Sequence, residues 1–301
     1  MTFSIVARCE ETGRFGVAST TGSICVGARC SWVRAGVGAV ATQHFTDPAL
    51  GDAILDTMEK WGGSADEALT AVMGSAAHRD HAAYRQVAVI DGEGVMAFWS
   101  GDSVGPPAGS AVGVDCVATG NLLADAAGVP AAMVAAFEAT AGRGLHLAER
   151  LLRGIEAGEA AGGEQGQIHS AALIVSHDEA LAGWPLVNLR VDYHDTNPLG
   201  QLRSIWERYE PQIPAYALRA ANPAVQIPST PAAAGADASA LTYRGHSFLL
   251  YFDAATEAAL AAAGSALDRI DQLGAVGQRY GYKPHISLSI CGGVDLRAAA
   301  A

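Results

Sequence analysis

The feature that most constrains the fold is an alternating run that begins at the second residue, in the stretch MTFSIVARC. Apolar residues at positions 3, 5 and 7 share one face of an extended chain, and Thr2, Ser4, Val6 and Arg8 share the other. A period of two is typical of a half-buried strand. The stretch EETGR then predicts a turn and FGVAS a returning strand, so we expect a hairpin at the start. Chain starts usually fray, whereas this one is predicted to lie in a sheet.

The later strand and helix patterns come in blocks. We expect strands at 23–27, 36–42, 85–91, 95–99, 116–120, 170–175 and 186–192, and helices at 48–73, 131–159 and 198–209. The first helical stretch is split at Gly62-Gly63 and the second is interrupted near Gly142 and Gly144. This order predicts an α+β domain of antiparallel sheets covered by helices, and not the strict alternation of a doubly wound fold.

Composition divides the chain into three parts. Residues 1–209 hold the segments named above and form the first predicted domain. Residues 210–241 are rich in Pro, Ala, Ser and Gly, which is typical of a linker. Residues 242–301 predict a strand, an Ala-rich helix and a second strand. So short a segment is small for an independent core, and we expect an αβ appendage packed on the first domain.

Charge and apolar patterning exclude several functions. The formal net charge is −12, so the chain offers no basic stripe for nucleic acid. No basic leader and no apolar run of about 18 residues occurs, so we expect neither secretion nor a membrane span.

Cysteine and histidine spacing predicts no metal site. The five cysteines are scattered without a C-x-x-C pair, which favours buried thiols in a reducing, cytoplasmic compartment. His78 and His81 have a spacing that a metal pair could use, but no carboxylate motif accompanies them. We therefore expect a polar loop there, and neither a metal nor an organic cofactor.

Thr2 is the candidate nucleophile. A threonine hydroxyl needs a base, and the residue's own free α-amine can serve when the chain starts at that threonine. With an ordinary pKa near ~7.7–8, much of that amine is neutral at physiological pH. Thr2 meets this requirement if Met1 is trimmed, and the strand would hold the geometry that a base needs. Threonine at position 2 is also common without any catalytic role.

Several motifs, taken together, resemble a known family. In chain order they are MTFSIVAR, GRFGVAS, RAGVGAVATQ, ATGNLLA, GLHLAERLLRGIEAGEAAGG, HSAALIV and NLRVDYH, over about residues 1–208. They are similar to those of the bacterial DUF-1028 family, which is assigned to the N-terminal nucleophile (Ntn) hydrolase superfamily. The resemblance implies a four-layer αββα sandwich, with the nucleophile on the first strand at the mouth between two stacked sheets.

The resemblance also implies roles for further residues. Arg34 stands near the place of the basic residue that lowers the pKa of the amine in proteasome β-subunits; its alternative use is as a sheet-edge cation. Where those relatives carry an Asp, this chain has Ser19, Thr20, Thr21 and Ser23, and we expect Thr20 and Thr21 to contact substrate. This departure leaves a proteasome-like charge relay unsupported.

The same resemblance suggests how a developing negative charge would be bound. Backbone N–H groups around Thr42 and Gln43 are the expected oxyanion donors, with the side-chain amide of Asn121 as a further donor. The alternatives are ordinary strand-end residues at 42–43 and a helix N-cap at 121. His44 is expected to line the same pocket, or else to be a packed or solvent-exposed histidine.

The tail resembles one half of a different enzyme. The stretch YKPHISLSI is similar to one H-x-[ST] motif of the 2H phosphoesterases, through His285-Ile286-Ser287. Those enzymes use two such histidines, and His246-Ser247-Phe248 has the wrong spacing for the second. We therefore expect a degenerate or interaction role for this segment.

These observations favour an amidohydrolase that cleaves a linear or cyclic amide bond of a small molecule by N-terminal threonine catalysis. The alternative is a non-catalytic Ntn-like binding scaffold with a C-terminal interaction segment. Layered domains of this kind often assemble, so a homo-oligomer is compatible with this sequence.

Overall fold

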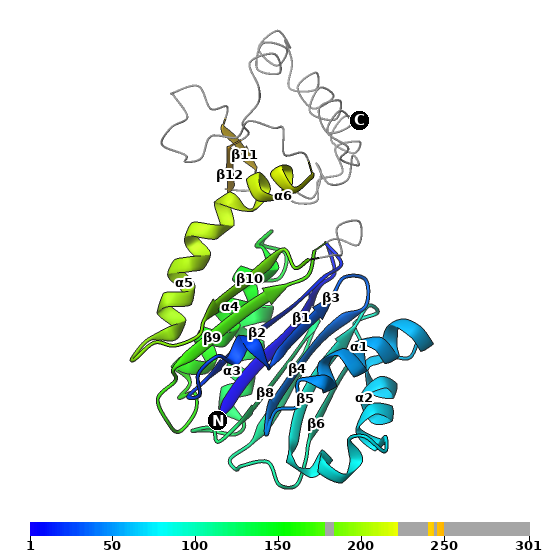
Figure 1. Cartoon of the computed structure of the whole chain (residues 1–301). Coiled ribbons are helices and arrows are strands. Elements are labelled where there is room, and N and C mark those ends of the chain that lie inside the picture. Colours follow the sequence, from blue (N-terminus) through cyan, green and yellow to red (C-terminus); the bar gives the residue numbers. More distant parts are fainter. Residues whose placement is uncertain (178–183, 222–239, 244–245, 250–301) are drawn as a thin grey trace. The chain divides into compact units, whose positions relative to one another are not determined.

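Two antiparallel sheets face each other in the first part of the chain (Figure 1). The computed structural model describes residues 1–177, 184–221, 240–243 and 246–249. One sheet has the strand order β10-β9-β2-β1-β8-β7 and the other β3-β4-β5-β6. The strands are β1 (Thr2–Cys9), β2 (Arg14–Thr21), β3 (Ser31–Arg34), β4 (Gly38–His44), β5 (Arg85–Asp91), β6 (Met96–Ser100), β7 (Gly109–Gly113), β8 (Cys116–Asn121), β9 (Ser170–Val175) and β10 (Val187–Val191).

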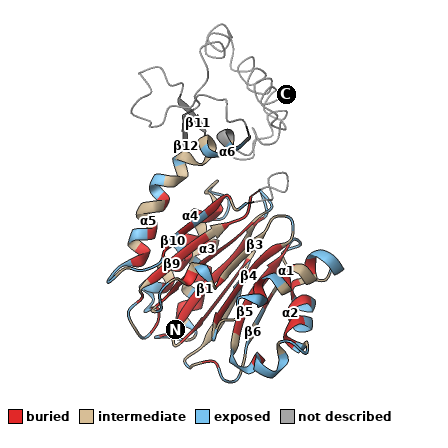
Figure 2. Cartoon of the chain, in the orientation of Figure 1, coloured by how far each residue is buried: buried red, intermediate tan, exposed pale blue. Residues whose placement is uncertain are grey.

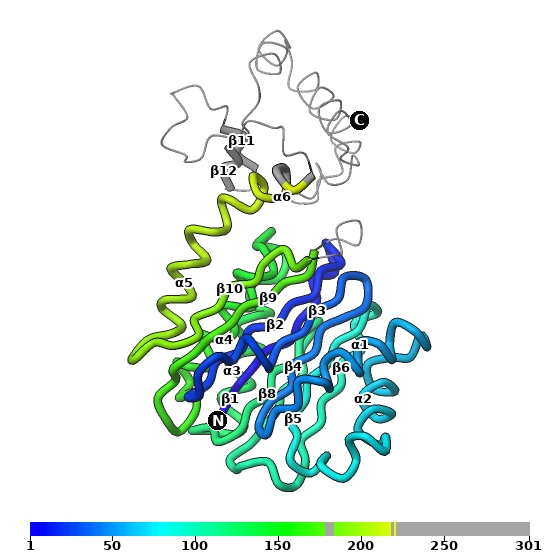
Figure 3. The backbone as a smooth tube through the Cα atoms, in the orientation of Figure 1, coloured from blue at the N-terminus to red at the C-terminus, as the bar shows by residue number. Residues whose placement is uncertain are grey.

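Helices cover the outer face of each sheet. The helices α1 (Ala49–Trp61) and α2 (Ala65–Gly74) pack on the four-stranded sheet, and α3 (Gly128–Glu138) and α4 (Leu147–Ala160) pack on the six-stranded sheet. The result is four layers in the order α, β, β, α. The predicted α+β class is therefore confirmed. The backbone trace in Figure 3 shows how β1 and β2 lie beside β8 and β9, which come more than a hundred residues later.

The alternation in the first strand decides which residues face which layer. Phe3 and Ile5 face α4, because a Cβ added to Gly158 would lie 3.1 Å from Phe3 Cε2, and one added to Gly154 would lie 3.1 Å from Ile5 Cδ1. Val6 lies in the core between the sheets. Since side chains alternate along a strand, Thr2 and Ser4 also face the opposite sheet.

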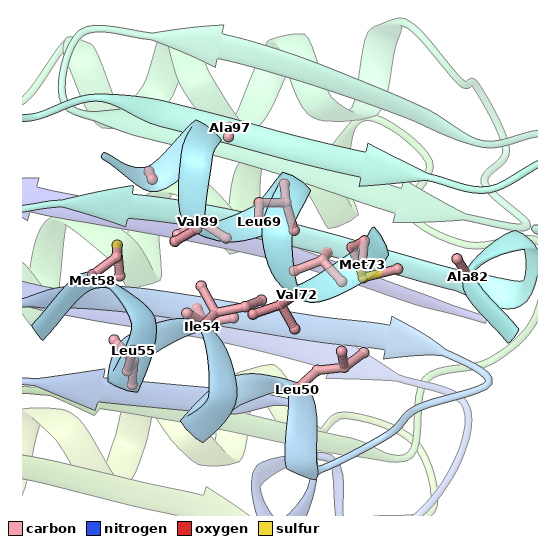
Figure 4. Close-up of a cluster of buried hydrophobic side chains, with 14 residues drawn as sticks. Leu50, Ile54, Leu55, Met58, Leu69, Val72, Met73, Ala82, Val89 and Ala97 are labelled. Atoms are coloured by element: carbon pink, nitrogen blue, oxygen red, sulfur yellow. The ribbon is translucent and has the colours of Figure 1, made fainter. Parts of the chain in front are cut away.

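The α1 and α2 layer is held by an apolar cluster against β4 and β5 (Figure 4). Ile54 and Leu50 of α1 have no exposed surface, and Leu69 and Met73 of α2 are at most 3% exposed. In Figure 2 the strands are mostly buried, and the outward faces of these helices are exposed. Burial of one face per helix is what the spacing of the apolar residues predicted.

The structure differs from the predicted elements at three short segments. Residues 23–27 were expected to be a strand, but 23–25 are irregular and the 3₁₀ helix η1 (Val26–Ala28) begins at Val26. Cys25, which precedes η1, has a left-handed φ of 59°, and its N–H donates to the Asp192 carbonyl at 2.9 Å, which bends the chain off the sheet. The strands β3 and β7 were not predicted, because four or five residues give too short a pattern.

The first third of the predicted linker at 210–241 is helical. After α5 (Pro198–Tyr209), the chain continues as the 3₁₀ helix η4 (Glu210–Gln212) and the helix α6 (Ile213–Ala221). Pro211 lies in the first turn of η4, a position where a missing N–H has no cost.

The chain divides into two units, Met1–Trp206 and Glu207–Ala301. In the second unit, β11 (Ala240–Tyr243) pairs antiparallel with β12 (His246–Leu249). The rest of the predicted linker and αβ appendage, with its H-x-[ST] motif, lies outside the described residues. Within the described residues, no helix combines the length and apolar composition that crossing a bilayer requires.

Removing the side chain of Ile54 tests the packing of α1. We expect Ile54→Ala to lower the free energy of unfolding by about 2–5 kcal/mol, because it leaves a cavity in a filled cluster. Ile24→Ala is the matched control, since Ile24 is 58% exposed, and its effect should stay within about 0.5 kcal/mol. Urea unfolding followed by circular dichroism measures both; equal losses would contradict the described packing.

Candidate active site

The space between the two sheets is apolar at one end and polar at the other. Five strands change character toward the same end: β1 from Val6 to Thr2, β2 from Val17 to Thr21, β4 from Ala39 to Gln43, β5 from Ile90 to Gln86, and β8 from Val117 to Asn121. The polar side chains at this end are at most 6% exposed: Thr2, Ser4, Ser19, Thr21, Gln43, Gln86 and Asn121. Buried polar groups need hydrogen-bond partners.

Ser4 links three strands in this polar region. Its hydroxyl lies 2.9 Å from Ser19 Oγ on β2 and 2.7 Å from Gln43 Oε1 on β4. Ser19 Oγ in turn lies 3.1 Å from Ser31 Oγ on β3. The two sheets are therefore joined by hydrogen bonds as well as by apolar contact.

Gln43 and Gln86 extend this chain of hydrogen bonds to β8. Gln43 Nε2 donates to Gln86 Oε1 at 2.7 Å and lies 3.3 Å from the Thr2 carbonyl oxygen. Asn121 Nδ2 donates to the same Gln86 oxygen at 2.9 Å, and Gln86 Nε2 donates to the Gly120 carbonyl at 3.0 Å. We call Ser4, Ser19, Ser31, Gln43, Gln86 and Asn121 the inter-sheet network. It holds the start of β1 by its carbonyl group.

The hydroxyl of Thr2 lies beside the inter-sheet network, which contacts the Thr2 carbonyl oxygen through Gln43. Thr2 Oγ1 lies 3.1 Å from Thr21 Oγ1, and both hydroxyls also contact the Met1 carbonyl oxygen. Thr21 Oγ1 accepts a bond from the Ser23 N–H at 3.3 Å, which orients its own proton toward other acceptors. Two hydroxyls thus surround one carbonyl oxygen.

Asn121 offers an acceptor here and not the donor that the sequence led us to expect. It pairs with Thr2 in the register of β1 and β8, so both side chains face the opposite sheet. Its Nδ2 is used by Gln86, and its fully buried Oδ1 has no hydrogen-bond partner within the described part of the chain. A buried acceptor without a donor costs folding free energy. The Asn121 Oδ1 atom could therefore accept a hydrogen bond from an N–H group that is not present in this form of the chain.

A buried carboxyl group, Glu164, also lies near the chain start. Glu164 is 6% exposed, and its backbone bridges to Leu123, just beyond the end of β8. Burial raises the pKa of Glu164 to about 8; the positive N-terminal amine and the Gly22 N–H oppose that rise, and Glu159 adds to it. Neither carboxyl oxygen has a hydrogen bond of normal geometry within the described residues.

Arg34 is not part of this region, which corrects the role suggested for it. Arg34 pairs with Gly38 at the beginning of β4, whereas Gln43 lies near its other end. Its guanidinium lies 2.8 Å from Asp56 Oδ1 and 2.7 Å from Glu59 Oε2 on α1. The hairpin register carries Arg34 away from Thr2, and the carboxylates of α1 hold it at the surface.

Thr42 and Thr20 do not face the space between the sheets, because alternation along their strands turns both side chains toward the helices. The roles expected of them are therefore not supported by their positions. Thr42 lies on the helix-facing side of β4 with Val40, and its N–H donates to the Cys30 carbonyl at 2.9 Å. That N–H is not free to bind an oxyanion. Thr20 pairs with Phe3 and faces away from Thr2, with its hydroxyl bonded to the Ser170 carbonyl at 2.8 Å.

His44 is held in place by both ring nitrogens. Nδ1 lies 2.8 Å from the Tyr84 carbonyl, and Nε2 accepts from the Gly105 N–H at 3.0 Å. This pair of bonds requires the proton on Nδ1. The ring therefore connects the backbone at Tyr84 to the backbone at Gly105. The packed-histidine alternative therefore describes it better than the pocket.

A hollow lies at the far end of the four-stranded sheet, between the α1–α2 connection and the β5–β6 turn. Asp91, which lines it, accepts from the Ala65, Glu93 and Val95 N–H groups at 2.8–3.0 Å. That carboxylate stabilises a turn and a helix start. The hollow contains no residue of the inter-sheet network, so we do not assign it a chemical role.

Sequence reasoning placed Thr2, Thr21, Gln43 and Asn121 together correctly but missed their partners. The alternation that assigned Thr2 and Ser4 to one face would also have pointed to Ser19 on the neighbouring strand β2 and to Gln86 on β5 of the opposite sheet. Glu164 gave no signal, because it is far from Thr2 in the chain and follows a helix in an irregular segment.

Comparison with known proteins places the chain in a structural context. A family model described as "Family of unknown function (DUF1028)" matches residues 2–202. The crystal structure of protein SPO2555 from Silicibacter pomeroyi, which carries the same family name, is 33% identical and aligns with a TM-score of 0.61. The alignment covers 69% of this chain and 85% of that one. No curated protein is significantly similar.

Substituting Gln43 tests the inter-sheet network. Gln43→Leu should cost about 1–3 kcal/mol of unfolding free energy for each buried partner left unsatisfied, and Ser4 and Gln86 both lose one. Gln201→Leu, at an exposed position of α5, is the matched control and should change stability by no more than about 0.5 kcal/mol. Urea unfolding compares the two, and equal stability of both variants would rule out the described bonds.

Proposed function

Because this chain belongs to the DUF1028 family, whose function is unknown, its activity has to be inferred from its site, and we propose that it is an amidohydrolase. In this proposal Thr2 is the nucleophile once residue 1 has been removed. The substrate is a small molecule with a linear or cyclic amide bond. The observation that carries the proposal is the placement of the buried Thr2 hydroxyl, with that of Thr21, around one carbonyl oxygen.

The proposed reaction needs only the groups at the start of β1. The free α-amine of Thr2 accepts the Oγ1 proton as this oxygen attacks the substrate carbonyl carbon. The Oγ1–C bond forms, the C–N bond breaks, and the amine returns the proton to the leaving nitrogen. Water then attacks the ester with help from the same amine, which releases the acid and restores Thr2.

The surroundings support this chemistry in two ways. Thr21 Oγ1 already donates to the carbonyl oxygen beside Thr2, so it can stabilise an oxyanion at that place. The unpartnered Asn121 Oδ1, opposite Thr2 in the strand register, suits an N–H of the new amine. Rigid strands on both sides of β1 limit the motion of nucleophile and base.

An acylation experiment tests Thr2 directly. Intact mass of the purified full-length chain should show the loss of Met1, and p-nitrophenyl acetate should then acetylate the Thr2 hydroxyl. Peptide mapping locates the adduct, and release by hydroxylamine distinguishes an ester from an acetylated amine. We expect Thr2→Ala to lose the ester and to lower kcat/KM for any amide substrate about 10³-fold or more.

Thr12→Ala is the control for this experiment, because Thr12 is exposed in the first turn; it should acetylate as the wild type does. Retention of Met1 in active protein, or undiminished amide turnover by Thr2→Ala, would overturn the proposed mechanism. Either result would favour the binding-scaffold alternative.

Thr21→Val tests the proposed oxyanion donor. The substitution keeps the shape and removes the hydroxyl, so kcat should fall about 10²-fold while KM changes little, as expected for a bond used in the transition state. Steady-state kinetics on the best amide substrate measures the split. A rise in KM with unchanged kcat would instead make Thr21 a ground-state binding residue.

A further inference from the structure

Met1 fills a place that the proposed function requires to be empty. Its side chain lies against two glycines: a Cβ on Gly166 would come within 2.9 Å of Met1 Cε, and one on Gly22 within 3.5 Å. Its carbonyl oxygen contacts the hydroxyls of Thr2 and Thr21. Met1 is 41% exposed, so this place is open to solvent.

Glu164 lies at the same place. A Cβ on Gly22 would lie 3.0 Å from Glu164 Oε1, so the carboxyl group and the Met1 side chain share Gly22 as a neighbour. The backbone around Glu164 is fixed to the end of β8, since Gln165 N donates to the Leu122 carbonyl at 2.8 Å and Ala124 N to the Gly163 carbonyl at 3.0 Å. We call Gly22, Glu164 and Gly166 the Met1 subsite.

The carboxyl group of Glu164 lacks the partners that so buried a group normally has. It is more than nine-tenths buried, and neither oxygen accepts a hydrogen bond of normal geometry from the described residues. Carboxyl groups are rarely buried in this way unless they are paired. The positive charge that opposes the rise of its pKa is the α-amine of Met1, and removal of Met1 transfers the N-terminal amine to Thr2.

We propose that the Met1 subsite binds the acyl part of the substrate, and that this substrate is an α-aminoacyl amide whose ammonium group pairs with Glu164. Met1 itself is such an acyl group: its carbonyl contacts the Thr2 hydroxyl, its amine opposes the rise of the Glu164 pKa, and its side chain lies on the two glycines. A substrate of the same shape refills these three positions. This inference rests on the proposed function and names its substrate class.

A matched pair of amides tests the role of Glu164. L-Methioninamide and 4-(methylthio)butanamide differ only in the α-amino group. Mature full-length protein should prefer L-methioninamide by about 10- to 100-fold in kcat/KM, the size expected for one charged hydrogen bond. Glu164→Gln should abolish this preference by lowering kcat/KM for L-methioninamide about 10- to 100-fold.

Glu138→Gln is the control variant, because Glu138 is a partly buried acid that accepts from the Val114 N–H, outside the Met1 subsite; it should keep the preference. Binding of both amides to mature Thr2→Ala protein, measured by calorimetry, gives a readout without turnover. It should show the same preference, and the double variant with Glu164→Gln should lose it.

The outcomes separate this inference from the proposed function. Equal hydrolysis of the two amides, or a preference that survives Glu164→Gln, overturns the Met1 subsite and leaves the hydrolase intact. Selective binding of L-methioninamide without hydrolysis supports the subsite and overturns the hydrolase. If the protein neither binds nor hydrolyses either amide, the inferred substrate class is overturned.

Discussion

The relative position of the two sheets depends on the hydrogen bonds between polar side chains that are buried between them. An inner face made only of Val and Ala would pack the sheets by area alone and would leave their relative position loosely specified. The inter-sheet network adds direction, because Ser4, Gln43 and Gln86 each reach a partner on a different strand. Such a network costs stability wherever one bond is missing, so it fixes the register of both sheets together.

The network also explains why the start of β1 is ordered. Thr2 pairs with Asn121 of β8, the next residue Phe3 pairs with Thr20 of β2, and Gln43 contacts the Thr2 carbonyl, so Thr2 is held more firmly than terminal residues usually are. Two of the buried groups without a hydrogen-bond partner among the described residues, Asn121 Oδ1 and the Glu164 carboxyl, lie near the same end. Both are acceptors, so their position is one where a donor from outside the described residues is expected. The proposed function and the inferred substrate class supply two such donors, an amine of the chain and an amine of the substrate.

Charge is distributed differently at the two ends of the sheets. At one end Arg34 and the α1 carboxylates form exposed ion pairs, which contribute little to stability and orient nothing toward Thr2. At the other end the interior polar groups are neutral hydroxyls and amides, with Glu164 the one carboxyl group assigned there among the described residues. A threonine mechanism at this place therefore relies on its own amine and on neutral donors, in contrast to the charge relay of the proteasome β-subunits that the family resemblance suggested for comparison.

By itself, the sequence determined the α+β class, the first hairpin, most helix bounds and the face on which Thr2 lies, because periods of two and 3.6 residues are local properties. It also carried enough family motifs to identify the first two hundred residues. Only the tertiary structure decided which polar residues meet. The register of β3 and β4 places Arg34 at the end of the sheet opposite to Thr2. Alternation directs Thr20 and Thr42 toward the helices. The segment after α4 places Glu164 near Met1. Register and crossovers depend on contacts between residues far apart in the chain, and no local pattern encodes them.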